Sequence, residues 1–294
     1  ILLVPQTRKK IMAKVTVRTL QKLKTSGEKI SALTAYDYST AKYIDQAGID
    51  IILIGDSLGM VALGYEDTTK VEVEEMAVFT KAVARGTQRA MVITDMPFMS
   101  YTIDIPSALT NIGNMVKYGA NAVKIEGCND YILELITRTV QAGIPVLGHI
   151  GFTPQSQNVI GGHIIQGKTT DDTMHLLQQA KLLQLAGAFA VVLEMVPEES
   201  AKYITENLEI STISCGAGRY CDGQILVCDD IFGKYSEFKP KFARRYGDMK
   251  SLILDCATKY NNDVKSGNYP NDEEVFKLSE EENELLNSKI LASK

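Results

Sequence analysis

Short apolar runs alternate with helix-length segments eight times between residue 30 and about residue 230. The runs lie at 30–36, 50–56, 90–96, 122–127, 145–151, 189–195, 212–218 and 223–229. Most of them are continuously apolar, which is typical of parallel strands covered on both faces. The pattern therefore predicts repeated β/α units built around one parallel sheet.

Glycines mark the ends of the helical segments between these runs. They are Gly48, Gly86, Gly119, Gly143 and Gly187. Glycine is favoured just past a helix because it adopts the left-handed backbone conformation without strain. Eight β/α units in one domain indicate an α/β protein with a TIM (β/α)8 barrel. A doubly wound open sheet is the main alternative, but no glycine-rich dinucleotide-binding motif follows the first run.

We expect the 294 residues to form a single barrel domain, with the barrel at about 30–245. An N-terminal helix precedes the barrel in this interpretation, and a C-terminal helical tail (246–294) ends in an acid-rich helix near 272–286. The tail would cover a surface or contact another subunit. Residues 1–27 hold seven Lys or Arg and no acid, which fits a basic first helix or the remnant of an organellar transit segment.

Composition limits the classes of partner. The chain is 45% hydrophobic and 23% charged, as in soluble globular proteins, and its net charge of −5 argues against nucleic acid. No stretch approaches the roughly 20 apolar residues of a membrane-spanning helix. The five cysteines lack a Cys-x-x-Cys pair and indicate reduced thiols rather than a zinc site. We expect a cytoplasmic protein, or a mitochondrial one if the source is eukaryotic.

Ionisable residues close five consecutive predicted strands, the second to the sixth: Asp56, Asp95, Glu126, His149 and Glu194. Active sites of TIM barrels lie at the C-terminal ends of the strands. Each residue alone has an ordinary explanation, since an Asp can cap the following helix and a His can be satisfied in the core. Closing the barrel would bring all five to one rim, which favours an active site.

Three carboxylates at one rim require positive charge, because packed like charges repel and raise each other's pKa. Side chains alternate along a strand, so Lys124 and Glu126 are expected to point into the barrel together. One divalent cation and one Lys would balance Asp56, Asp95 and Glu126. Ligands that are all oxygen favour Mg²⁺ or Mn²⁺ over zinc.

Two long loops follow the second and fifth runs, at 57–71 and 152–170, and are candidate lids or walls for a second substrate. Gly216, Ala217 and Gly218 precede Arg219 after the seventh run. This segment could cradle a phosphate or could be a tight turn that needs glycine.

Several long blocks between about 15 and 245 resemble the ketopantoate hydroxymethyltransferase family. They are LTAYDYSTAKYIDQAGIDIILIGDSLGMVALGYEDT, ITDMPFMSY, GANAVKIEG, GIPVLGHIGFTPQS, GAFAVVLEMVP and GAGRYCDGQILV. The resemblance implies a TIM barrel of the phosphoenolpyruvate/pyruvate superfamily. It implies transfer of a hydroxymethyl group from 5,10-methylenetetrahydrofolate to 3-methyl-2-oxobutanoate, which forms ketopantoate (2-dehydropantoate) for pantothenate and coenzyme A. It also implies a large ring-based homo-oligomer such as a decamer.

The resemblance also assigns roles to residues. It implies that Asp56, Asp95 and Glu126 hold the metal, that Asp56, Ser57, Asp95 and Lys124 contact the keto acid, and that Glu194 accepts the proton. The chemistry agrees, because Mg²⁺ would stabilise an enolate and Lys124 would add positive potential at its oxygen. Glu194 would act as general base. We expect His149 to orient the substrate or a metal-bound water.

The chain departs from the family at two places. The family carries a His where VCDD (227–230) has Cys228 or Asp229, and the segment YPNDEEVF lacks a His after Glu273. Both departures affect the expected folate or tail contacts rather than the metal or base positions.

Two other functions fit parts of the pattern. A phosphonomutase or a lyase like isocitrate lyase would share the metal and the keto acid, but the lyase's Lys-Lys-Cys-Gly-His loop is absent from the sequence. An inactive scaffold protein is the second alternative, but buried acids without partners would destabilise such a barrel.

Overall fold

The computed structural model describes residues 13–235 and 239–293. The first twelve residues lie outside this range, and so does most of the segment that was interpreted as the possible remnant of a transit segment. The chain divides into two compact units, 1–246 and 247–294, and each is described by itself.

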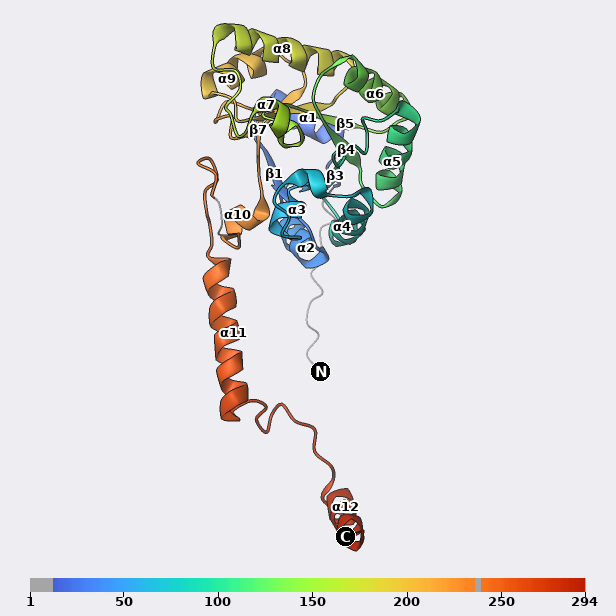
Figure 1. Ribbon diagram of the computed structural model, residues 1–294, viewed down its shortest axis with the longest axis vertical. Coiled ribbons are helices and arrows are strands. Elements are labelled where there is room, and N and C mark those ends of the chain that lie inside the picture. The colour runs from blue at the N-terminus through green and yellow to red at the C-terminus, as the bar shows by residue number, and fades with distance from the viewer. Residues whose placement is uncertain (1–12, 236–238, 294) are drawn as a thin grey trace, which may run out of the picture. The chain divides into compact units, whose positions relative to one another are not determined.

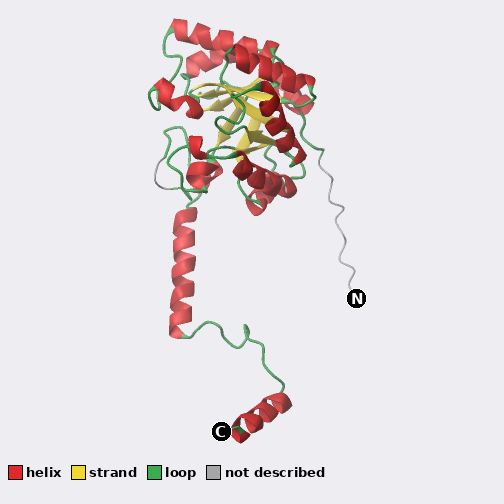
Figure 2. Cartoon of the chain, turned by 45° about the vertical axis from the view of Figure 1, so that its right-hand side comes forward, coloured by secondary structure: helices red, strands yellow, loops and turns green. Residues whose placement is uncertain are grey.

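The first unit is a closed barrel of eight parallel strands in the order β1 to β8, which confirms the predicted fold. Figure 2 shows the strands gathered inside a layer of helices. The strands are β1 (Ile30–Thr34), β2 (Ile51–Ile54), β3 (Met91–Asp95), β4 (Ala122–Glu126), β5 (Val146–Gly151), β6 (Ala190–Glu194), β7 (Ser211–Cys215) and β8 (Gly223–Leu226). Pairing of β1 with β8 closes the ring.

Helices connect and cover the strands (Figure 1). The larger ones are α2 (Tyr38–Gln46), α4 (Val73–Gly86), α5 (Ile105–Lys117), α6 (Asp130–Gln141), α8 (Thr170–Leu185) and α9 (Glu198–Glu206). The two long loops contain α3 (Leu58–Val61), η1 (Thr68–Lys70), η2 (Pro154–Ser156) and α7 (Gln157–Ile160). The short helix α10 (Cys228–Phe232) follows β8.

Two apolar cores hold the barrel together. The larger core lies between the outer face of the sheet and the surrounding helices, with buried side chains such as Ile54, Met76 and Ile112. The smaller core fills the barrel interior with side chains from every strand, among them Ile93, Leu147 and Val192. The interior is therefore packed rather than a pore.

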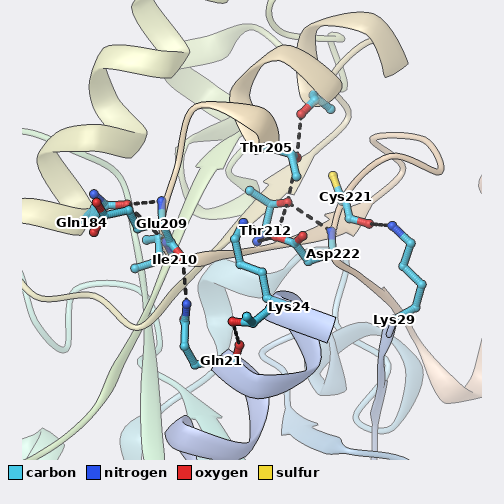
Figure 3. Close-up of polar contacts among 12 residues, drawn as sticks. Gln21, Lys24, Lys29, Gln184, Thr205, Glu209, Ile210, Thr212, Cys221 and Asp222 are labelled. Carbon is cyan, nitrogen blue, oxygen red and sulfur yellow. Dashed lines mark hydrogen bonds and ion pairs between the residues drawn. The ribbon is translucent and has the colours of Figure 1, made fainter. Parts of the chain in front are cut away.

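Helix α1 (Val17–Ser26) closes the N-terminal end of the barrel. Its Leu20, which is 1% exposed, belongs to the core of the barrel interior. Figure 3 shows the polar contacts around this core: Lys24 Nζ lies 2.8 Å from Asp222 Oδ2, just before β8, and Gln21 donates to the main chain of Glu209. Apolar packing and these contacts seal the end of the barrel opposite the predicted site.

The structure corrects several details of the prediction. β7 and β8 are shorter than expected, because Gly216 turns the chain with a φ of 72° and α10 begins at Cys228. Gly86 is not a left-handed cap: it is the last residue of α4, and a Cβ there would lie 2.5 Å from the Tyr38 carbonyl oxygen. Glycine is needed at this point because α2 and α4 approach closely.

The second unit contains α11 (Met249–Ser266) and α12 (Glu280–Ala292). The expected helix near 272–286 begins later, at Glu280, with Ser279 as its N-cap. The sequence analysis missed α11, whose N-cap is Asp248. Neither helix buries a residue within this chain. Within the described residues, no helix is both long and apolar enough to cross a membrane.

Candidate active site

Side chains on the inner face of the barrel change from apolar to ionisable at one level. On β4, Ala122 belongs to the interior core, and Lys124 and Glu126 follow it on the same face. The corresponding pairs on neighbouring strands are Ile93 and Asp95, Leu147 and His149, Val192 and Glu194, and Ile213 and Cys215. Alternation along each strand thus places a ring of functional groups above the packed interior.

Strand register makes these side chains neighbours around the ring. Asp95 pairs with Lys124, Glu126 with His149, and Glu194 with Cys215. The inward residues at the site are almost entirely buried, since Asp95, Lys124, Glu126 and His149 are each 6% exposed or less. The five strand-end residues predicted from the sequence therefore come together, as the closed barrel requires.

Asp56 and Asp95 form one side of the site with Lys124 beside them. The Lys124 ammonium group pairs with Asp95, and Asp95 Oδ2 accepts a hydrogen bond from the Asp56 backbone N–H. Burial, with repulsion from Asp95 and Glu126, raises the pKa of Asp56 to about 8. Burial opposes the charge of Lys124, but the surrounding carboxylates raise its pKa above the ordinary value. The site thus has more negative charge than its own cations balance easily.

His149 lies between two carboxylates. Its Nδ1 is 3.2 Å from Glu126 Oε1, and its Nε2 is 3.2 Å from Glu194 Oε2. Neither ring nitrogen makes a well-directed hydrogen bond, so both contacts are better described as ion pairs. Burial would lower the pKa of His149, but the charge of Glu126 outweighs it and raises the pKa to about 9. His149 is therefore a buried cation that links Glu126 to Glu194.

Gln155 was not found by the sequence analysis, yet it contacts two of the predicted metal ligands. Its Nε2 donates to Asp56 Oδ2 at 2.9 Å and to the Met96 carbonyl at 3.0 Å. Its backbone N–H donates to Glu126 Oε2 at 3.2 Å. The Tyr101 hydroxyl donates to Gln155 Oε1 and so fixes which way the amide faces. The neutral side chain gave no charge signal, and only its place four residues after β5 could have pointed to it.

A cavity of about 220 Å³ opens over the ring. Ser57 lines it and shares a hydrogen bond of 2.9 Å with the Tyr36 hydroxyl. Both long loops contribute walls, with Met60 and Val61 from one and Phe152 from the other. Both loops thus line the cavity, and their role in holding a second substrate stays a prediction.

The segment 216–218 behaves as a turn rather than as a phosphate cradle. Gly216 packs against Phe242, where a Cβ would lie 2.5 Å from the ring, and Gly218 packs against Glu198. Arg219 Nε is paired with Glu198 Oε2 at 3.0 Å. Asp37, at the end of the first predicted strand, caps α2 by accepting from Thr40 N–H.

The carboxylates fit a divalent cation in charge and in donor type. When all four are ionised, Asp56, Asp95, Glu126 and Glu194 face two cations, Lys124 and the His149 ring, which leaves an excess of two negative charges. The pKa of about 8 keeps Asp56 protonated at neutral pH without a metal, which reduces the excess to one. Glu126 Oε1 is buried and accepts no hydrogen bond. In the part of the chain that is described, no three His, Cys, Asp or Glu side chains lie close enough together to hold one ion as they stand. Mg²⁺ needs only one or two carboxylates beside water and substrate oxygens.

The sequence and the fold of this chain are both similar to those of known proteins. A family model described as ketopantoate hydroxymethyltransferase matches residues 14–272. A 3-methyl-2-oxobutanoate hydroxymethyltransferase of Caldicellulosiruptor saccharolyticus is 49% identical over 90% of this chain and 100% of its own length. The enzyme of that name in Clostridium botulinum is 51% identical over 90% of this chain and 97% of its own length.

Solved structures with much lower identity share the fold. Phosphonopyruvate hydrolase in complex with oxalate and Mg²⁺ aligns with a TM-score of 0.57 at 12% identity, covering 94% of this chain and 96% of its own. A 2,3-dimethylmalate lyase of the PEP mutase/isocitrate lyase superfamily aligns with a TM-score of 0.57 at 13% identity, covering 95% and 99%. At these identities the likeness concerns the barrel alone.

Proposed function

Because the chain belongs to the ketopantoate hydroxymethyltransferase family, we propose that it transfers a hydroxymethyl group from 5,10-methylenetetrahydrofolate to 3-methyl-2-oxobutanoate, forming ketopantoate. The observation that carries the proposal is the buried ring of Lys124, Glu126, His149 and Glu194 beside Asp56, in a chain about half identical to enzymes of this name. The product would feed the synthesis of pantothenate and coenzyme A. The relatives above are bacterial, which supports a cytoplasmic rather than a mitochondrial enzyme.

The proposed metal ion is Mg²⁺, with Mn²⁺ as a substitute, held by Asp56, Asp95 and Glu126. When bound, it would polarise the keto oxygen and favour loss of the proton on the neighbouring carbon. Gln155 supports this assignment, because it fixes the Asp56 carboxylate and the Glu126 carboxylate from one short helix. Ser57 lies next to Asp56 on the cavity wall, where it can contact the carboxylate of the keto acid.

Glu194 is the proposed general base. Its side chain is 16% exposed, so it reaches the cavity while the other members of the ring are more deeply buried. The imidazole of His149 holds it in place from below. Glu194 would take the proton from the third carbon of the keto acid, and the Lys124 ammonium would stabilise the negative charge that develops on oxygen. The resulting enolate carbon would then form a bond to the methylene carbon of the folate donor. The bonds from that carbon to the two folate nitrogens would break, and a water molecule would supply the hydroxyl group. The remaining proton of that water and the proton taken by Glu194 would complete the two N–H groups of tetrahydrofolate.

Deuterium exchange separates the proton-transfer step from the group transfer. The protein is incubated with Mg²⁺ and 3-methyl-2-oxobutanoate in deuterated water without folate, and loss of the third-carbon proton is followed by NMR. We expect metal-dependent exchange that falls by about 10²–10⁴-fold in Glu194→Gln. The matched control is Glu198→Gln, which alters an acid four residues further on that pairs with Arg219 outside the ring.

Exchange that persists in Glu194→Gln at the wild-type rate would remove Glu194 as the base. Adding 5,10-methylenetetrahydrofolate then tests the second step. Exchange without formation of ketopantoate would instead favour a relative that uses another electrophile.

A homo-oligomer is also part of the proposal. Apolar side chains recur along α11 at helical spacing (Met249, Ile253, Tyr260 and Val264), and each is at least 40% exposed in the single chain. Light scattering after size-exclusion chromatography should give a mass near 323 kDa for a decamer of 32.3 kDa chains. Ile253→Asp with Val264→Asp should lower this mass, whereas Lys259→Ala on the polar face should not. A monomeric wild-type protein would contradict the proposal.

A further inference from the structure

One wall of the cavity is apolar and lies beyond the proposed base. Leu226 and Val227 at the end of β8 and Phe242 in the following segment line it, together with Asp230 from α10. None of these residues has a part in the proton transfer described above. Asp230 is the one acid of this group, and its surroundings are otherwise suited to a flat apolar ligand.

Asp230 is only 9% exposed, yet its carboxylate has no partner. Among the described residues, no side chain or backbone N–H donates a hydrogen bond to it, and none forms an ion pair with it. Its neighbour Asp229 is different, since Asp229 Oδ1 lies 2.9 Å from Lys234 Nζ. A buried carboxylate without donors is costly and calls for an explanation.

Structural roles do not account for Asp230. The N-cap of α10 is Val227, and no side chain caps this helix. Arg245 attracts the carboxylate without forming an ion pair with it, while burial and the charge of Asp229 act against ionisation. The group therefore faces the cavity with both oxygens able to accept hydrogen bonds.

The position of Asp230 relative to the base indicates what it could bind. Cys215 pairs with Glu194 in the strand register, and the charges of both Glu194 and Asp230 act on its thiol. Asp230 thus lies on the side of the cavity where Glu194 would expose the reacting carbon. A carbon electrophile held on this side would meet the face of the planar enolate from which Glu194 removes the proton.

We propose that Asp230 binds the 2-amino-4-oxopyrimidine edge of the one-carbon donor. This inference rests on the proposed function. The edge presents an amino group and an adjacent ring N–H side by side, which match the two oxygens of a carboxylate in a bidentate contact. The flat ring would lie against the apolar wall formed by Val227 and Phe242. The ligand would thereby supply the donors that the chain itself does not.

Asp230→Asn tests the proposal, because the amide keeps the shape but turns one acceptor into a donor. We expect the dissociation constant of tetrahydrofolate, measured by calorimetry with Mg²⁺ and keto acid present, to rise about 10- to 100-fold. The folate-independent deuterium exchange should stay within about twofold of wild type. The matched control is Glu66→Gln, since Glu66 lines the same cavity but is exposed and paired with Lys70.

An analogue of tetrahydrofolate without the 2-amino group sharpens the test. Wild type should bind it more weakly than tetrahydrofolate, and Asp230→Asn should bind the two alike. Tetrahydrofolate binding that is unchanged in Asp230→Asn overturns the assignment of Asp230 and leaves the proposed function standing. A wild-type protein that shows no metal-dependent exchange overturns the proposed function, and this inference with it.

Discussion

Gln155 joins Asp56 and Glu126 through its amide group and its backbone N–H, and the hydroxyl of Tyr101 sets the orientation of that amide. Because the Asp56 and Glu126 carboxylates repel each other, a neutral donor that contacts both can hold them in place without changing the charge of the site. Groups that orient metal ligands in this way usually affect affinity more than overall stability.

Replacing Gln155 by Leu should weaken binding of Mg²⁺ or Mn²⁺ by about 10- to 100-fold, since both carboxylates lose a fixed orientation. Binding of Mn²⁺ can be followed directly by electron paramagnetic resonance, without any turnover. Tyr101→Phe should have a smaller effect, because the amide remains but can rotate. Gln178→Leu, on the exposed face of α8, serves as the control. Equal affinities in all four proteins would show that Gln155 does not orient the ligands.

Asp230 should also affect stability in a pH-dependent way. Burial and Asp229 raise its pKa from 3.8 to about 6, with Arg245 opposing them. A raised pKa of an acid favours the folded state below the unfolded pKa, and this contribution is lost as the pH rises through about 6. Asp230→Asn should therefore raise the melting temperature more at pH 8 than at pH 5. The corresponding gain in the free energy of unfolding at pH 8 should be at most about 3 kcal/mol.

Asp229→Asn is the matched control for this pH dependence, because it breaks the ion pair with Lys234 and should lower the melting temperature at pH 8. A stabilisation by Asp230→Asn that is equal at both pH values would mean that the charge of Asp230 is not the cause.

Helix α4 approaches α2 so closely that its last residue has no room for a side chain. A Cβ on Gly86 would lie 2.5 Å from the carbonyl oxygen of Tyr38, which is backbone and cannot move aside cheaply. Gly86→Ala should lower the free energy of unfolding by about 1–3 kcal/mol. Gly113→Ala, inside α5 with open space around it, should raise that energy by about 0.4–1 kcal/mol. Denaturant titration would measure both, and a stabilising Gly86→Ala would contradict the close approach.

The sequence pattern was sufficient to predict the eight strands, because apolar runs bounded by glycine are a local signal. It was also sufficient for the ring of Asp95, Lys124 and Glu126, because strand alternation and barrel closure place these residues together. Gln155 escaped prediction since its role depends on contacts between segments far apart in the chain. Helix α11 was missed although apolar residues recur along it at helical spacing, because charged, Asn and Tyr residues are mixed with them.

At the scale of the whole barrel, the cavity and the ring of ionisable side chains lie at one end. The N-terminal end is closed by α1, whose Leu20 completes the apolar interior and whose Lys24 pairs with Asp222. The ionisable ring lies at the opposite end, below a cavity whose upper wall carries Asp230 and Phe242. Ligands of the ring would therefore enter and leave the described barrel through this cavity.

Because the barrel is closed at its N-terminal end and open at the other, its ligands would bind and leave in a fixed order. Under the proposed assignments, the keto acid would bind at the ring first, because a folate held at Asp230 would occupy the cavity that opens over the ring. After the reaction the order would reverse, and tetrahydrofolate would leave before ketopantoate. Product-inhibition kinetics should thus show ketopantoate competing with 3-methyl-2-oxobutanoate for the free enzyme. Because α1 closes the far end of the barrel, the last molecule to bind would be the first to leave.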